Sequence, residues 1–493
     1  MATSLRNAIL VALAATPTIQ QTCTGDVKCT CELLRDVLTE VNGTVLPSDG
    51  DTYKDIEDEN YSAACRLPAA CIVSPKNAQE VSTVVKILSQ TGAKFAIRSG
   101  GHNYIPGFAS VDEGVLISLS SLNSTELSED KKTAKIGPGN RWQAVYEALV
   151  PEGLVVVGGR VGPVGVGGLM LGGGLSYFAT QRGLALDNVK SYEVVLADGA
   201  IVTASADNEY SDLYQGLRGG ASNFGIVTSY ELYTYPARDF YVDARAYSPN
   251  QTSDFLRAVA EYQKEGQLDP SSSISVQLLE SGPTILLLYN EPVQQAKAFD
   301  AFYALGTYQP IVPAFNGSLL DIMALTGSRF STGETRTYGE TFSHKTDADL
   351  MVELYSIFTE ETASLPSGAS AVWVPNSIAA SVATLGKQHG GNLLGLEEVP
   401  QQWYEWYITW TEPTQDRAIW DISQRITQRC TDAAKAKDLL LPYLFMNTAG
   451  KTQDVLNSYG ADNVEFIKAA AAKYDPGRVF QTLQNDGFLV RNL

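Results

Sequence analysis

The sequence predicts an α+β protein of two structural units. Its 493 residues exceed the length that one hydrophobic core usually organises. Between residues 70 and 236, short β-branched runs alternate with helical patterns and glycine-rich turns. Between 237 and 439, glycine clusters become fewer and the strand candidates longer. We therefore expect an α+β unit followed by an antiparallel sheet with helices on one face.

The elements of the first unit follow from apolar runs bounded by turn residues. A helix is expected after Ser74-Pro75, because Val81, Val84 and Leu88 recur at helical spacing. Strands are expected at 71–73, 94–98, 114–119, 133–136, 191–196 and 226–235.

The second unit and the C-terminal segment show the same kinds of pattern. We expect a helix over 254–265 and strands over 274–279 and 284–289. In the last segment, a helix over 464–473 is expected to end before Pro476, because proline cannot continue a helix.

Charge and hydropathy argue against nucleic acid and membranes as partners. The formal net charge is -19 and the pI about 4.7, whereas both partners attract concentrated Lys and Arg. No run approaches the roughly 20 apolar residues of a spanning helix. Arg6, a short apolar run at 9–15 and the small residues after it are typical of a secretory signal peptide over 1–20. The alternative is an amphipathic N-terminus of a cytosolic protein.

The cysteines and glycosylation motifs favour export. Six cysteines form an even set, and five of them lie within the first 71 positions, which suits disulfides in a cysteine-rich segment over 21–65 and just beyond it. Zinc is the alternative, but zinc sites use Cys-x2-Cys or Cys/His sets, so we expect no metal. Acceptor motifs for N-glycosylation occur at Asn42, Asn60, Asn123, Asn250 and Asn316.

Three glycine clusters follow one another at 99–107, 158–168 and 172–174. Consecutive backbone N–H groups without Cβ atoms can converge on an anion, so such loops could hold a diphosphate without lysine. The alternative for each cluster is a simple turn. Neither a complete Rossmann fingerprint nor a Walker A motif is present.

These motifs together resemble a known family. Arg98-Ser-Gly-Gly-His102, the 165–176 stretch and Asn223-Phe-Gly-Ile-Val227 resemble the FAD-binding domain of the vanillyl-alcohol oxidase superfamily. Residues 473–480 are similar to the berberine-bridge-enzyme-like branch, of fungal type. The resemblance implies a PCMH-type FAD-binding domain of two α+β subdomains over 66–236. It further implies a substrate domain over 237–439, its antiparallel sheet flanked by helices, and a segment over 440–493 that completes the FAD domain.

The resemblance also assigns cofactor-binding positions. It implies that His102 bonds covalently to FAD, and a neutral imidazole is a suitable nucleophile for that bond. Val161 stands where bicovalent relatives carry a second linking cysteine, so a single link is expected. Val164 matches a position whose small side chains tend to admit O2. The other implied positions are Arg98, Ser99, Gly100, Gly101, Asn103, Gly107, Gly162, Gly165, Gly168, Gly172, Gly173, Gly174, Ser176, Ile226, Val227 and Asn447.

The proton acceptor is less well defined, because Thr448 and Phe445 depart from the family pattern around Asn447. Tyr443 is the first candidate and Tyr104 the second. The alternatives are core packing for Tyr443 and a loop cover for Tyr104. The aromatic set at 403–410 is expected mainly in the core, although one face of it could line a pocket. His344 and His389 are expected at the surface or in loops.

We therefore expect an FAD-dependent oxidoreductase, an oxidase that takes a hydride from a small organic alcohol, phenol or secondary metabolite. Electrons would pass to O2 to give H2O2. The expected partners are this small molecule and O2, and the protein is expected to be a monomer. Three alternatives stay open: a carbohydrate or oligosaccharide oxidase, against which the single link argues mildly, a biosynthetic cyclase on a flavin fold, and a non-enzymatic flavin-binding protein.

Overall fold

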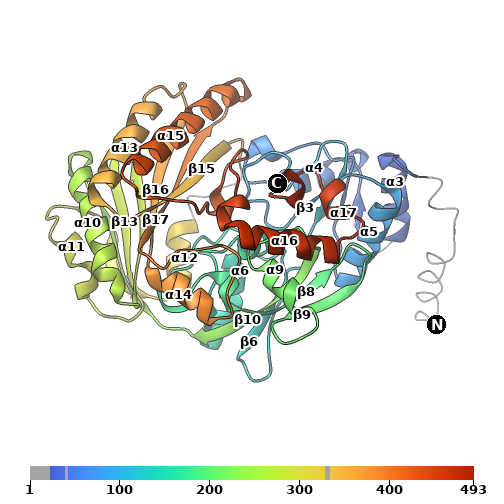
Figure 1. Ribbon diagram of the computed structural model, residues 1–493, viewed down its shortest axis with the longest axis horizontal. Helices are drawn as coiled ribbons and strands as arrows, with labels where there is room; N and C mark the ends of the chain where they lie inside the picture. Colours follow the sequence, from blue (N-terminus) through green and yellow to red (C-terminus); the bar gives the residue numbers. More distant parts are fainter. Residues whose placement is uncertain (1–22, 39–42, 328–332) are drawn as a thin grey trace.

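The computed structural model describes residues 23–38, 43–327 and 333–493, which form three β-sheets with helices around them (Figure 1). The strands are β1 (Thr44–Val45), β2 (Cys71–Val73), β3 (Phe95–Arg98), β4 (Val115–Ser118), β5 (Thr125–Leu127), β6 (Thr133–Ile136), β7 (Leu154–Val156), β8 (Val189–Val195), β9 (Ile201–Ser205), β10 (Ile226–Pro236), β11 (Phe240–Ala246), β12 (Ser272–Leu279), β13 (Gly282–Tyr289), β14 (Gln309–Gly317), β15 (Arg336–Lys345), β16 (Ser370–Ile378), β17 (Gln401–Trp410) and β18 (Leu440–Leu441).

The helices connect these strands and cover the faces of the sheets. They are α3 (Val27–Val37), α4 (Asp51–Glu57), α5 (Ala78–Thr91), α6 (Trp142–Leu149), α7 (Val166–Leu171), α8 (Ala179–Arg182), α9 (Ser211–Leu217), α10 (Thr252–Lys264), α11 (Asp300–Tyr303), α12 (Leu319–Gly327), α13 (Ala348–Thr362), α14 (Ala380–Gln388), α15 (Asp416–Ala436), α16 (Ala461–Tyr474) and α17 (Val479–Thr482).

The first sheet has the order β1-β2-β4-β3, and β4 pairs in parallel with both β2 and β3. Helix α5 connects β2 to β3. It begins after Asn77, whose side chain accepts a hydrogen bond from the Glu80 backbone N–H, and it ends at Gly92 in the left-handed region, at φ 71°. Its apolar face packs into a core that includes Leu88 and Phe95. This arrangement places the end of β3 and the loop after it beside the second sheet.

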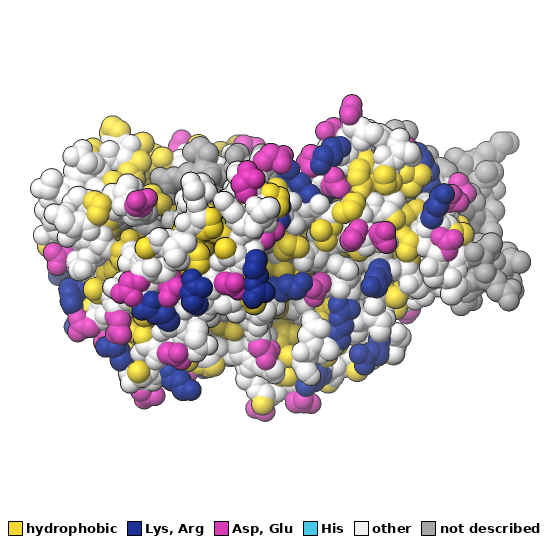
Figure 2. Space-filling model, turned by 90° about the horizontal axis from the view of Figure 1, so that it is seen from above, with side chains coloured by type: hydrophobic (Ala, Val, Ile, Leu, Met, Phe, Trp, Pro, Cys, Tyr) yellow, Lys and Arg dark blue, Asp and Glu magenta, His cyan; other side chains and the backbone are white. Residues whose placement is uncertain are grey.

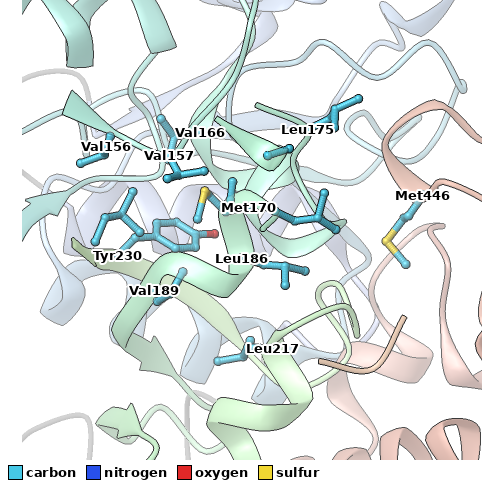
Figure 3. Packing of buried hydrophobic residues seen from close by; sticks show 14 of the residues in the cluster. Val156, Val157, Val166, Met170, Leu175, Leu186, Val189, Leu217, Tyr230 and Met446 are labelled. Atoms are coloured by element: carbon cyan, nitrogen blue, oxygen red, sulfur yellow. The ribbon is translucent and has the colours of Figure 1, made fainter. Parts of the chain in front are cut away.

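The second sheet is antiparallel, with the order β5-β6-β10-β8-β9 and β7 paired to β10. Buried aliphatic side chains from its strands and from α7 form the main core of this part of the molecule, into which Met446 reaches from the C-terminal segment (Figure 3). The glycine-rich segment that contains α7 therefore lies between the sheet and the C-terminal segment.

The third sheet has eight strands in the order β14-β11-β13-β12-β16-β17-β15-β18. It begins at Phe240 and its last strand ends at Leu441. Helices α10, α13 and α15 cover one face (Figure 1). Alternate residues of β17 serve opposite faces: Trp406 donates a hydrogen bond to Ser423 of α15, whereas Glu405 and Tyr407 face away from the helices into a cavity.

The C-terminal segment returns from the third sheet to the first two. α16 packs against α9, and the backbone N–H of Asn485 donates to the Phe95 carbonyl at 2.7 Å. The chain beyond Leu441 is therefore anchored to the part of the molecule built on the first two sheets, whereas β18 just before it belongs to the third sheet.

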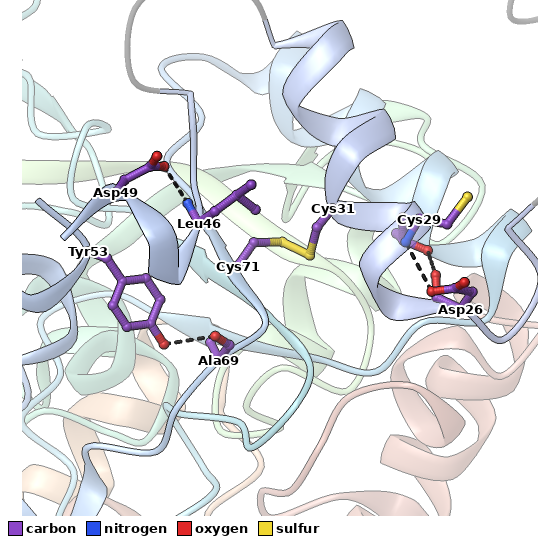
Figure 4. Close-up of a disulfide and its surroundings, with 9 residues drawn as sticks. Asp26, Cys29, Cys31, Leu46, Asp49, Tyr53, Ala69 and Cys71 are labelled. Carbon is purple, nitrogen blue, oxygen red and sulfur yellow. Dashed lines mark hydrogen bonds between the residues drawn. A yellow bond between two sulfur atoms is a disulfide. The ribbon is translucent and has the colours of Figure 1, made fainter.

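Two disulfides hold the N-terminal segment, as the cysteine pattern predicted. Cys31–Cys71 joins α3 to β2 (Figure 4), and Cys23–Cys29 closes a short loop. Cys65 and Cys430 are buried free thiols, so the even count of six does not correspond to three disulfides.

The exposure of the glycosylation motifs differs. The side chains of Asn123, Asn250 and Asn316 are exposed, whereas Asn60 is only 1% exposed and its amide donates to the Cys65 carbonyl at 3.2 Å. A glycan on Asn60 would therefore have no room in the folded chain. Asn42 and the predicted signal peptide lie outside the described residues.

Figure 2 shows one face of the molecule, on which basic side chains stand among acidic ones. Within the described part of the chain, no helix combines the length and the apolar character needed to cross a membrane.

Candidate active site

The predicted glycine loops meet at a cavity of about 360 Å³. Seven of its lining residues are glycines, contributed by the loop after β3, the segment around α7, the start of β10 and the C-terminal segment. A smaller cavity of about 110 Å³ lies against the third sheet. Arg160, Val161, Glu405 and Tyr407 line both, so these residues mark the place where the two cavities adjoin.

His102 lies in the loop that follows β3, on the wall of the larger cavity. The ring of Tyr61 stacks on its imidazole, with centroids 4.3 Å apart and an interplanar angle of 7°. Burial and the nearby positive charge of Arg141 lower the pKa of His102 to about 4. The imidazole is therefore neutral at neutral pH, which is the nucleophilic form.

Arg141 joins the two glycine loops. Its guanidinium donates to the carbonyl oxygen of Gly100, and to that of Pro163 at 2.8 Å. The loops approach so closely that a Cβ on Gly100 would lie 2.4 Å from the Cα of Gly165. Only glycine fits at these two positions, so the glycines in the sequence are explained by a contact between the two backbones.

Asn447 connects the C-terminal segment to the second glycine loop. Its side-chain oxygen accepts from the Gly174 N–H at 2.9 Å, and its amide donates to the carbonyl oxygens of Gly168 and Leu169. A Cβ on Gly172 would lie 2.4 Å from the Asn447 amide nitrogen. These glycines therefore make room for Asn447.

Most predicted cofactor positions line the larger cavity. They are Ser99, Gly100, Gly101, His102, Asn103, Val161, Val164, Gly165, Gly168, Ile226, Val227 and Asn447.

The other predicted positions do not line the larger cavity. Arg98 is fully buried and pairs with Glu59 at 3.0 Å, which fixes the base of the histidine loop. Those that do not line the cavity are Arg98, Gly107, Gly162, Gly172, Gly173, Gly174 and Ser176.

Of the two tyrosines expected as proton acceptors, Tyr104 lies at the larger cavity and Tyr443 does not. Tyr443 does not line either cavity; it is buried between Trp403 and Tyr459, and burial raises its pKa well above the usual range. This position corresponds to the core-packing alternative for Tyr443. Tyr104 does line the larger cavity, but its hydroxyl donates to the Thr448 carbonyl and burial raises its pKa, so it retains its proton.

Glu405 is a polar cavity residue that the sequence patterns did not single out, and Tyr407 beside it belongs to the aromatic set of which one face could line a pocket. Burial raises the pKa of the Glu405 carboxyl, against the positive charge of Arg160 and the hydrogen-bonding side chain of Tyr407, which lower it. Glu405 is thus a carboxyl group at the edge of the cofactor-sized cavity with a tyrosine beside it. The alternation of aromatic residues in β17 predicted a strand, but only the third sheet shows which face meets the cavity.

Of the two remaining histidines, one has the surface position expected for it and one does not. His389 is exposed, as predicted. His344 is fully buried in β15, where Phe342 and Tyr404 stack near it, so its predicted surface position was wrong.

Comparisons with known proteins agree with this geometry. Residues 69–205 match the family described as "FAD binding domain". The chain is 40% identical over 488 residues to the "FAD-dependent monooxygenase macF" of Penicillium terrestre, covering 98% of this chain and 93% of the relative. It is 36% identical over 469 residues to the "Bifunctional solanapyrone synthase" of Alternaria solani, covering 94% and 90%. The chain belongs to the berberine-bridge-enzyme-like FAD-linked oxidoreductases with a PCMH-type FAD-binding domain.

The fold of this family is also seen in a solved structure. The carbohydrate oxidase from Microdochium nivale superimposes with a TM-score of 0.78 at 19% identity, over 93% of this chain and 99% of the other. The protein is therefore an FAD-dependent enzyme with the predicted α+β architecture. The larger cavity fits FAD, because the backbones of Gly100, Gly165 and Gly167 form part of its wall at points where a Cβ would meet neighbouring atoms within 3.0 Å.

Proposed function

We propose that this oxidoreductase holds FAD through a single covalent bond to His102 and oxidises a small organic alcohol, phenol or secondary metabolite. FAD supplies a hydride acceptor when it is bound. The observation that carries the proposal is that the histidine loop and Glu405 line one cavity, which adjoins a second cavity large enough for part of a small molecule.

His102 is suited to the covalent bond. Its neutral imidazole can act as a nucleophile, and the stacked ring of Tyr61 fixes the plane in which it does so. Val161 lines the cavity at the position where bicovalent relatives carry a cysteine, and valine cannot form a second link. The two buried free thiols, Cys65 and Cys430, do not line either cavity.

Glu405 is the proposed proton acceptor. As the substrate carbon loses a hydride, its hydroxyl proton passes to the Glu405 carboxylate, which Tyr407 and Arg160 support. Overall, an alcohol and O2 give a carbonyl compound and H2O2, so two electrons and two protons leave the substrate. Val164 lines the cavity and is small, which is consistent with access for O2.

A monooxygenase is the second candidate, because relatives at 40% identity carry that name. It would place one oxygen atom of O2 in the product and consume an external reductant. A carbohydrate oxidase rests on likeness of fold alone.

One experiment separates these functions. Flavin reduction by a panel of benzylic alcohols, phenols, polyketide-like compounds and sugars is followed without oxygen, and 18O2 is then admitted. We expect reduction by a compound of the first three groups, one H2O2 for each product molecule and no 18O in the product. Incorporation of 18O with consumption of NAD(P)H would establish the monooxygenase instead, and no reduction by any compound would favour a flavin-binding protein or a cyclase.

We also propose that the protein is secreted, monomeric and N-glycosylated. The disulfides Cys23–Cys29 and Cys31–Cys71 support secretion, and the exposed motifs at Asn123, Asn250 and Asn316 support N-glycosylation. The mass of the protein from a fungal culture medium, before and after removal of N-glycans, tests all three properties when it is combined with light scattering.

A further inference from the structure

Arg160 lies where the two cavities adjoin and lines both of them. Among the described residues that line either cavity, it is the only lysine or arginine. Its guanidinium donates to the side-chain oxygen of Asn376 at 2.8 Å. Among the described residues, no carboxylate oxygen lies within 4.0 Å of its side-chain nitrogens, although the Glu405 carboxyl lines the same two cavities and interacts with it electrostatically.

The position of Arg160 is fixed from two sides. Its carbonyl oxygen accepts hydrogen bonds from the Tyr177 hydroxyl at 3.2 Å and from the Thr326 hydroxyl at 3.3 Å, and both residues line the smaller cavity. Asn376 of β16 holds the guanidinium itself. The cation is therefore preorganised, and a ligand would not have to order a flexible arginine.

The surroundings of Arg160 favour an anion. Part of the smaller cavity is walled by Ile285, Leu286, Leu325 and Val374, and Glu405 is the one acidic side chain among its described lining residues. A guanidinium offers five N–H donors, of which Asn376 engages one, so donors remain for a ligand in the cavities. Arginine also matches the planar geometry of an oxyanion such as a carboxylate.

We infer that Arg160 binds an oxyanion of the substrate, whose apolar body lies against the aliphatic wall of the smaller cavity. The inference rests on the proposed function, since it concerns the substrate of that site. It narrows the substrate class to organic acids: a carboxylate, or a phenol or enol acidic enough to ionise, next to an apolar skeleton.

Two pairs of probes test this inference on the flavin-loaded protein. Benzoate and benzamide share a shape and differ in charge, and so do pentafluorophenolate and pentafluoroaniline. Binding is followed through the visible spectrum of the flavin and, independently, by calorimetry. We expect at least one anion to bind at least tenfold more tightly than its neutral partner; the pair that shows this preference distinguishes a carboxylate from an ionised phenol.

The variants assign the preference to Arg160. Arg160→Gln should abolish the tenfold preference and Arg160→Lys should keep part of it, while the melting temperature and flavin content report whether each variant is folded. Arg417→Gln, which removes an exposed arginine of α15, is the matched control and should bind as the unaltered protein does. Equal binding within both pairs, no binding by any probe, or a preference that survives in Arg160→Gln would overturn the inference. The flavin-reduction panel also contains neutral alcohols. If one of them reduced the flavin while neither probe pair showed a preference for the anion, the inference about Arg160 would fail and the proposed function would still hold.

Discussion

The regions around His102 and His344 resemble each other chemically and differ in what they face. Desolvation lowers the pKa of both imidazoles to about 4, and an aromatic ring lies near each. His102, however, lies on a loop at the cavity, whereas His344 is fully buried in β15 and its Nδ1 is 2.6 Å from the Lys345 carbonyl oxygen. A shifted pKa therefore does not distinguish the two histidines, whereas their access to the cavity does.

The largest expected effect follows from removing each histidine in turn. In His102→Ala, all of the yellow colour should leave the polypeptide on acid precipitation, because no second link replaces the imidazole. His344→Ala should retain covalent flavin and lose stability, by about 2 kcal/mol or more, because it leaves a cavity among aromatic side chains. If flavin stayed bound to denatured His102→Ala, the proposed difference in role between His102 and His344 would be wrong.

The next effect concerns two buried carboxyl groups. Glu405→Gln should slow anaerobic flavin reduction by about 10²- to 10³-fold, because the substrate proton then has no acceptor. Glu340 is the matched control: burial raises its pKa too, but its partners are Tyr338, Gln424 and Thr427, away from the cavities. If folded Glu340→Gln lost as much of the flavin-reduction rate as Glu405→Gln, the rate would depend on a buried carboxyl group as such and not on its position at the cavity.

The cofactor half was more predictable than the substrate half. The contact between Gly100 and Gly165 could be expected from the sequence, since only glycine fits at these two positions. Strands β6 and β10 also form where the apolar runs predicted them. Tyr61 could not be predicted, because it reaches His102 through a backbone hydrogen bond between distant segments, from the Tyr61 N–H to the Gly101 carbonyl at 2.9 Å.

In the substrate half, strand alternation does not reveal which face meets a ligand. Trp406 and Tyr407 are neighbours of the same chemical type, yet the first packs against α15 and the second lines the cavities. The helices that cover one face of the third sheet decide between them, and that is a property of the whole fold. The place of Tyr443 was open for the same reason, because an aromatic residue near a motif can equally belong to the core, where the structure has it.

Lowering the pH should reduce the stability of the folded protein through His344. The folded pKa of His344 is about 4 and its ordinary value 6.5, so the unfolded chain binds a proton between these pH values and the folded chain does not. The free energy of unfolding should therefore fall as pH decreases from 6.5 to 4, by on the order of 3 kcal/mol from this residue. Denaturant unfolding of His344→Gln should show a correspondingly flatter dependence; an unchanged slope would refute the assignment.

The smallest expected effect comes from the ring stacked on His102. Tyr61→Leu should slow covalent attachment of FAD a few-fold, because the imidazole plane is then less well fixed, whereas Tyr61→Phe should retain the unaltered rate. In-gel flavin fluorescence over time after FAD is added to flavin-free protein measures it. Equal rates in all three proteins would mean that the stacking does not position His102.

Mass spectrometry of tryptic peptides tests the central claim most directly. Cleavage after Arg98 and Lys131 releases the 99–131 peptide, which contains His102 and the glycosylation motif at Asn123. After removal of N-glycans, this peptide should carry one FAD, attached to the histidine, and no other peptide should carry flavin. Flavin on a different peptide, or an unmodified 99–131 peptide from yellow protein, would contradict the account.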